Sequence, residues 1–407
     1  MVQGSIIIGR SGTKFSTLIW LRVAIVYVLS IALPGNLAVA QRRAVSQQNF
    51  ATLSAQADAA RAADHLDQAT VLYKKALTLR PAWSEGWWSL GTVEYDQSKY
   101  AEASRAFQRL IALKPKGGDG DGTAFVMLGL CEFELGHDRN ALRHIEQGKN
   151  IGIAKDNQLQ DVMNYHEGIL LQRSGKFEGA REVLDELCAN GVHSKELVNG
   201  LGMVALQMRD KDPPLQEPEA QIIARVGVAT CLAAQHKFDQ AQQVITAVVQ
   251  QYPDFPYIHY AYGRLLLDVD HPKAATQQFE QEIKDNPGDA IARLQIAAVN
   301  YRVDSAAGLP YAEEAVKLDP NYPFGHYLLG LLLLDTGSYQ KAIPELEIAR
   351  RYFPQEAQVY FALGSAYAHV GRKQDAARAR ATFARLKQQQ PSEQERAGGE
   401  MDTKPQQ

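Results

Sequence analysis

Residues 323–356 read PFGHYLLGLLLLDTGSYQKAIPELEIARRYFPQE, and this segment decides the fold. On both sides of Gly337 its apolar residues recur every three or four positions, which is the spacing of amphipathic helices. Gly330 lies midway along the first helix, where the absence of a side chain lets a second helix approach closely. Pro354 cannot continue the second helix. The segment therefore predicts a helical hairpin that turns at Gly337 and ends at Pro354.

The same marks recur along the chain at a period of about 34 residues. Prolines stand at positions 81 and 115, and again at 253, 287, 320 and 354. Small residues mark the middle of each first helix at Ala57, Gly91, Gly129, Gly168, Gly202, Ala229, Gly263, Ala297, Gly330 and Gly364. Because one hairpin cannot bury its apolar faces alone, we expect the hairpins to stack around one continuous core.

These marks resemble the tetratricopeptide repeat, a helix–turn–helix unit with Leu/Gly, Ala, aromatic and Pro residues at fixed offsets. Residues 323–356 match nearly every offset, and 84–117 and 357–390 follow with small departures. The resemblance covers roughly 51–388. It implies an all-α fold, an α-α superhelix in which the stacked repeats form a right-handed solenoid. It also implies that the first helix of each repeat lines the concave side.

Breaks in the period suggest how the chain is divided. The repeats near 122–155 and 161–194 lack the closing proline, and the pattern fails around 195–217. We therefore expect an N-terminal block, an unpaired helix with a proline-rich loop, a C-terminal block and a disordered tail. Their predicted bounds are 51–192, 193–217, 218–388 and 389–407.

Residues 1–40 have the pattern of an export signal. Basic residues at positions 10, 14 and 22 precede the apolar run 23–33, and Ala38-Val39-Ala40 precedes Gln41. A charged start, a short apolar run and an A-x-A end are typical of a secretory signal peptide. The alternative is an uncleaved membrane anchor that begins near Phe15. In both cases we expect the protein to work beyond the cytoplasmic membrane, periplasmic or secreted if the signal is cleaved.

The composition excludes several classes of protein. Of 407 residues, 45% are hydrophobic and 22% charged, which is a globular balance and not that of a disordered or multi-spanning chain. The net charge of −3 provides no basic field for nucleic acid. Three cysteines cannot form a disulfide framework. We expect Cys131, Cys188 and Cys231 to be buried as small apolar residues.

Catalytic and metal-binding motifs are missing from the sequence. No H-E-x-x-H occurs, and no Cys/His cluster has zinc spacing. The run 117–122 hints at calcium, but it lacks the downstream Glu of an EF-hand and is typical of a connector. We therefore expect no cofactor, no metal and no enzymatic activity.

The candidate binding residues come from the first helices. Offsets 2, 5, 9 and 12 lie on one face of a helix, and the resemblance implies that this face lines the groove. Trp, Tyr and Arg are the residues that most often anchor protein interfaces. The candidates are Trp88, Tyr95, Phe133, Tyr165, Tyr257, Tyr260, Arg264, Tyr301, Arg302, Tyr327 and Phe361. The alternative is that these aromatic residues pack between repeats.

Arg264 and Arg302 fall in neighbouring repeats, where together they would face an acidic side chain or a terminal carboxylate. Their alternative partners are Asp268 and Asp304 within the chain. The Lys and Asn clamp by which some members of the family hold a carboxylate is absent from the matching offsets.

The sequence thus predicts a non-enzymatic interaction protein of the cell envelope or exterior, which binds a peptide or protein in its concave groove. Two alternatives stay open. One is a structural subunit of an envelope assembly or secretion complex. The other is glycan or peptidoglycan binding, for which Asp96, Asp268 and Asp335 are the candidate carboxylates by offset.

Overall fold

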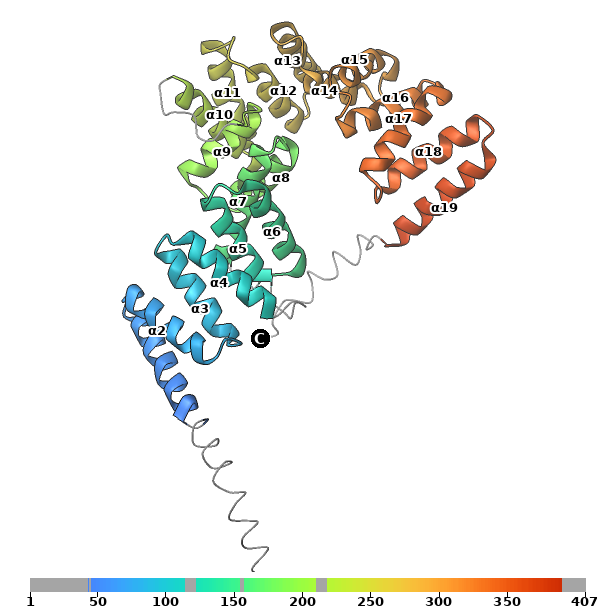
Figure 1. Ribbon diagram of the computed structural model, residues 1–407. Helices are drawn as coiled ribbons and strands as arrows, with labels where there is room; N and C mark the ends of the chain where they lie inside the picture. The colour runs from blue at the N-terminus through green and yellow to red at the C-terminus, as the bar shows by residue number, and fades with distance from the viewer. Residues whose placement is uncertain (1–42, 44, 114–121, 154–156, 210–217, 390–407) are drawn as a thin grey trace, which may run out of the picture. The chain divides into compact units, whose positions relative to one another are not determined.

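The computed structural model describes residues 43, 45–113, 122–153, 157–209 and 218–389 (Figure 1). Within these ranges the chain forms helices joined by short turns, and no strand. The predicted all-α repeat fold is therefore confirmed. The expected signal peptide at 1–40, most of the connector at 117–122, most of the proline-rich loop and nearly all of the tail lie outside the described residues.

The chain divides into two compact units, at Met1–Met163 and Asn164–Gln407. The described part of the first unit begins with a helix that ends at residue 62. Five further helices follow, and each packs against the next one along the chain (Figure 1). Their bounds are α2 (Leu66–Leu79), α3 (Ser84–Asp96), α4 (Tyr100–Leu113), α5 (Gly122–Glu134) and α6 (Asp138–Ile151).

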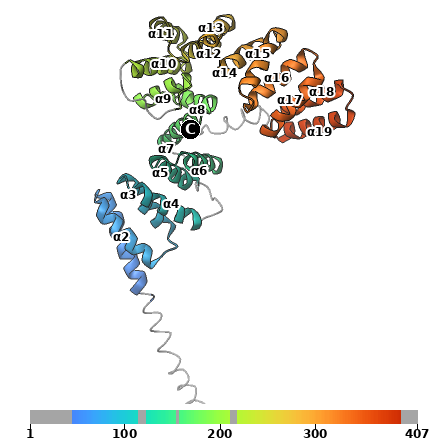
Figure 2. The same cartoon turned by 45° about the horizontal axis from the view of Figure 1, so that its top comes forward.

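In the second unit, successive hairpins pack in chain order, and the first helices α14, α16 and α18 also contact one another in turn (Figure 2). Helix α7 (Asn157–Arg173) crosses the boundary between the units. The others are α8 (Phe177–Ala189), α9 (Lys195–Ala205), α10 (Glu219–Ala234), α11 (Phe238–Gln251), α12 (Ile258–Asp268), α13 (Pro272–Asp285), α14 (Ala290–Asn300), α15 (Ser305–Leu318), α16 (Pro323–Asp335), α17 (Tyr339–Tyr352), α18 (Ala357–His369) and α19 (Lys373–Gln389).

In the regular repeats, the glycine of the first helix touches the residue sixteen positions later, in the second helix. A methyl group on Gly330 would lie 2.6 Å from the Leu346 side chain, and one on Gly91 would lie 2.8 Å from the Phe107 ring. Leu346 and Phe107 are fully buried. The sequence-based reason for these small residues is thus confirmed, because a larger side chain would separate the two helices.

A second contact repeats where one hairpin meets the next. The fourth residue of the first helix reaches back six positions to the carbonyl of the closing proline. Trp87 Nε1 donates to Pro81 O at 2.8 Å, and Tyr360 Oη donates to Pro354 O at 2.9 Å. His326 Nε2 lies 2.9 Å from Pro320 O. The carbonyl left over at a helix end thereby gains a partner.

Helix α9 corrects one expectation. It lies within the predicted 193–217 segment, but it is not unpaired, because it packs along α10. Gly202 of α9 and Gly227 of α10 lie where the two backbones cross, each against a carbonyl of the other helix. Ser194 caps α9 by accepting from Leu197 N at 3.0 Å. The pair was missed because Gly227 falls outside the 34-residue period.

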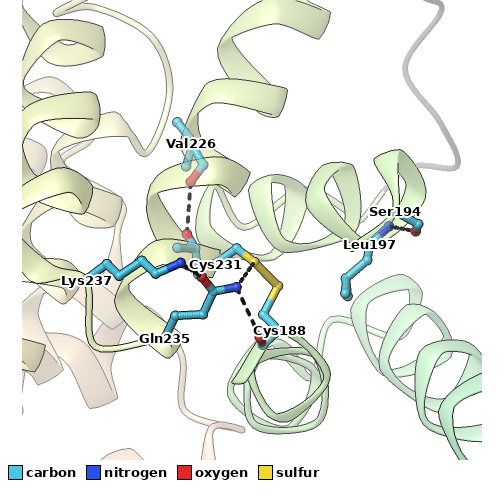
Figure 3. Close-up of a disulfide and its surroundings, with 8 residues drawn as sticks. Cys188, Ser194, Leu197, Val226, Cys231, Gln235 and Lys237 are labelled. Carbon is cyan, nitrogen blue, oxygen red and sulfur yellow. Dashed lines mark hydrogen bonds between the residues drawn. A yellow bond between two sulfur atoms is a disulfide. The ribbon is translucent and has the colours of Figure 1, made fainter. Parts of the chain in front are cut away.

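The three cysteines are buried as expected, but two of them do not remain separate apolar side chains. Cys188 at the end of α8 and Cys231 of α10 form a disulfide, with Cα atoms 5.5 Å apart (Figure 3). Gln235 Nε2 donates to Cys188 O at 3.1 Å beside this bond. Only Cys131 is a buried free thiol, and burial raises its pKa to about 12. Sequence spacing does not reveal the pair, since α8 and α10 come together only through the irregular packing around α9.

The close approach predicts opposite effects at two glycines. Gly330→Ala should lower the free energy of unfolding by about 1–3 kcal/mol, because its methyl group meets fully buried Leu346. Gly364→Ala should be neutral or stabilising by up to about 1 kcal/mol, because its methyl group meets the flexible Arg380 side chain at 3.3 Å. Urea unfolding followed by circular dichroism measures both. Equal effects of the two substitutions would contradict the packing argument.

The disulfide predicts a loss of stability on its removal. Cys188 and Cys231 are 43 residues apart in sequence, so the double change to Ala frees a long loop in the unfolded chain. We expect the free energy of unfolding of the second unit to fall by about 2–4 kcal/mol. Reduction of the unaltered chain is the matched control, as it breaks the cross-link without removing either sulfur. A double variant or a reduced chain as stable as the oxidised chain would contradict the role of the bond.

Candidate functional site

The candidates in the first unit take part in packing. Trp88 lies edge-on to Phe107 with ring centroids 5.7 Å apart, and Tyr95 lies edge-on to Tyr100 at 5.3 Å. Both are half-buried against one apolar cluster, and Phe133 is half-buried as well. Burial raises the pKa of Tyr95 to about 12, so its hydroxyl stays neutral. These contacts favour the packing interpretation for Trp88 and Tyr95.

Tyr165 and Tyr257, both in the second unit, are also half-buried. Tyr165 lies edge-on to His166 at 5.2 Å. Tyr257 caps the start of α12 with a left-handed φ of 59°, and its ring lies edge-on to Tyr260 at 6.5 Å. Burial raises the pKa of Tyr257. Each ring thus has a partner within the chain.

Tyr260, Arg264 and Asp268 follow one another at four-residue steps and form one stripe along α12. This stripe faces α8. Tyr260 Oη donates to Glu178 Oε1 at 3.2 Å, and Arg264 Nη2 donates to Glu178 Oε2 at 3.1 Å. Arg181 forms an ion pair with Asp268. The chain's own α8 therefore covers this part of the predicted binding face.

Two sequence-based expectations are wrong here. Tyr260 is only 2% exposed, so its ring offers no surface to a partner. Arg264 pairs with Glu178 and with Gln295, at 3.0 Å, instead of with Asp268. The two errors have different causes, because the Tyr260 ring packs against Phe279 of α13, whereas Arg264 pairs with Glu178 of α8. A substitution of Tyr260 would consequently test stability before it tested binding.

Burial and charge compensation dominate the contact between α8 and α12. Burial raises the pKa of Asp185 to about 6, although neighbouring Arg181 opposes that shift. Burial also disfavours the Arg181 cation, but Asp268 and Asp185 outweigh this and raise its pKa. Burial raises the pKa of Tyr260, with the Glu178 charge adding to the effect. Each charged group thus faces an opposite charge within the chain, as expected of an internal contact.

Farther along the second unit, four aromatic side chains and one arginine form what we call the aromatic surface. Its members are Tyr301, Arg302, Phe324, Tyr327 and Phe361. Phe324 and Phe361 are 42% and 55% exposed, on the adjacent first helices α16 and α18. The Phe324 and Tyr327 rings lie 6.3 Å apart. Large apolar side chains exposed together are typical of an interaction site.

Charged residues flank the aromatic surface without covering it. Arg302 is exposed, and its guanidinium lies 5.1 Å from the centre of the Tyr301 ring, so it does not pair with Asp304 as the alternative expected. Asp304 instead caps α15 by accepting from Ala307 N. Burial, then the charge of Glu356 at the start of α18, raises the pKa of Tyr327. The Arg302 charge lowers the same pKa, so a cation and a carboxylate both act on Tyr327.

Sequence profiles of the tetratricopeptide repeat match residues 54–118, 89–141, 232–299, 302–345 and 327–393. Together the matches cover more than half of the chain. The chain belongs to the tetratricopeptide-repeat family. No curated protein matches it.

Solved tetratricopeptide-repeat structures are similar to parts of this chain. MamA shares 20% identity over 40% of this chain and 95% of its own, with a TM-score of 0.37. MamA from Desulfovibrio magneticus RS-1 shares 20% sequence identity over 41% of this chain and 96% of its own, with a TM-score of 0.38. A tetratricopeptide repeat protein from Parabacteroides merdae shares 15% sequence identity over 70% of this chain and 99% of its own, with a TM-score of 0.32.

Within this tetratricopeptide array, sequence analysis missed Phe324, although it stands at offset 2 of its repeat, where the rule that selected Tyr257 applies.

Two classes of site are not found among the described residues. No group of three or more His, Cys, Asp and Glu side chains there is placed to hold a metal ion. No helix of the described part is long and apolar enough to cross a membrane.

Proposed function

We propose that this chain is a non-enzymatic scaffold of the cell envelope or exterior that binds a protein or peptide through the aromatic surface. Tetratricopeptide repeats support a role in protein–protein interaction. The observation that carries the proposed site is the exposure of Phe324 and Phe361 on the adjacent first helices α16 and α18, whereas Tyr260 of α12 is buried. Exposed aromatic anchors contribute most of the energy at protein interfaces.

Two observations support the location outside the cytoplasm. The first is the signal-like pattern of residues 1–40. The second is the Cys188–Cys231 disulfide, because such bonds persist mainly in oxidising compartments. A cytosolic protein would keep both thiols reduced.

The location is tested in cells that express the full chain. The mature protein should begin at Gln41, and its Cys188 and Cys231 should resist thiol labelling until a reductant is added. Deletion of residues 2–40 should leave the protein in the cytoplasm with both thiols reactive. A chain that retains Met1 in the membrane fraction would favour the anchor. A full-length cytoplasmic protein with reactive thiols would contradict export altogether.

The binding surface is tested with a photo-crosslinking amino acid at position 361, and at position 352 as the control. Tyr352 is 54% exposed, but it lies on the second helix α17. We expect position 361 to capture a specific protein, and Phe324→Ala with Phe361→Ala to weaken its binding by about tenfold or more. Capture at 352 alone, with affinity unchanged in the double variant, would favour the structural-subunit alternative.

A further inference from the structure

A cavity of about 320 Å³ lies among the last three helices, away from the aromatic surface. Its lining includes Glu347 and Arg350 of α17, Tyr360 of α18, Arg372 of the following turn, and Asp375 and Arg378 of α19. This volume is within the range of small-molecule sites. The cavity therefore has room for a ligand and polar groups to orient one.

The last repeat differs from two preceding repeats at this cavity. In those two repeats, a histidine near the start of the first helix meets a polar residue nineteen positions later. His326 Nδ1 lies 2.6 Å from Glu345 Oε2, and His259 Nδ1 lies 2.7 Å from Gln278 Oε1. In the last repeat these offsets carry Tyr360 and Ala379, both of which line the cavity. A methyl group thus stands where those two repeats carry a carboxylate or an amide.

The lining has an excess of positive charge. Three arginines meet two carboxylates, since Glu347 pairs with Arg350, and Asp375 with both Arg372 and Arg378. Arg350 reaches Glu347 through Nε and Nη2. A guanidinium has five N–H donors, so these pairs leave donors for another acceptor. The start of α19 at Lys373 adds the positive end of a helix dipole.

Neighbouring contacts hold the cationic groups in place. The Arg372 guanidinium lies 4.4 Å above the centre of the Tyr367 ring, and the Tyr367 hydroxyl donates to Glu347. Hydrogen bonds from Arg378 and Arg372 lower the pKa of Asp375, which therefore remains an anion and keeps both arginines beside it. The three arginines are 44%, 50% and 77% exposed, so a solute reaches them from solvent.

We propose that this cavity binds a small oxyanion-bearing molecule, whose carboxylate or phosphate group is held by Arg350, Arg372 and Arg378. Guanidinium groups pair with carboxylate and phosphate oxygens in two-point geometry. Tyr360 lines the side of the cavity left open by Ala379, where it meets the rest of the ligand. The site lies apart from the aromatic surface, and it holds whether or not a protein partner binds there.

The test is calorimetric titration of the full chain with sodium phosphate and with sodium citrate, at constant ionic strength set by sodium chloride. We expect saturable binding of at least one anion. Tighter binding of citrate assigns the site to a carboxylate ligand, and tighter binding of phosphate to a phosphorylated one. No saturable binding beyond that of chloride would overturn the proposal.

Variants then place the binding in the cavity. Arg378→Gln should weaken anion binding by about tenfold, because it removes a charge-assisted hydrogen bond. Ala379→Glu should weaken anion binding to a similar extent, because it restores the acidic residue found in the preceding repeat. Arg378 is 77% exposed, so its substitution leaves folding intact even if the change at Ala379 does not. Arg351→Gln and Arg385→Gln are matched controls on α17 and α19 outside the lining. Equal weakening by the controls, or none by Arg378→Gln, would overturn the site.

Discussion

The structure depends on the close approach of two helices at one small residue in each repeat. Where Gly330 meets Leu346, and Gly91 meets Phe107, a single added methyl group would overlap a fully buried side chain. Helices that approach this closely bury more apolar area and leave fewer voids. Because each hairpin stacks only on its neighbours, the same contact must recur in every repeat for the core to be continuous.

The recurring contact leaves the remaining offsets free to vary, and their variation creates distinct surfaces on one scaffold. At α12 the variable offsets carry Tyr260 and Arg264, which are occupied by Glu178 of α8. In α16 and α18 the variable offsets carry the exposed aromatic rings of Phe324 and Phe361. At the last hairpin, Ala379 and three arginines line a cavity. One packing rule therefore supports an internal contact, a candidate interface and a candidate anion site.

The irregular segment from α8 to α10 is stabilised by means that the regular repeats do not use. Gly202 and Gly227 let the backbones of α9 and α10 cross closely, and the Cys188–Cys231 bond joins α8 to α10. Ion pairs between α8 and α12 add charge compensation in a buried setting. The covalent link thus joins two helices, α8 and α10, that both pack against α9.

The sequence by itself determined the helical hairpins, their period and the reason for the glycines at positions such as 330, because these features depend on residues close together in one repeat. Offsets along a helix also located Tyr327 and Phe361 on one face. Only the tertiary structure decided which of the proposed residues remain accessible. Glu178 and Tyr260 lie 82 residues apart, and Cys188 and Cys231 lie 43 apart. The pattern of a single repeat carries no information about contacts between segments so distant, since these form only where the array departs from its period.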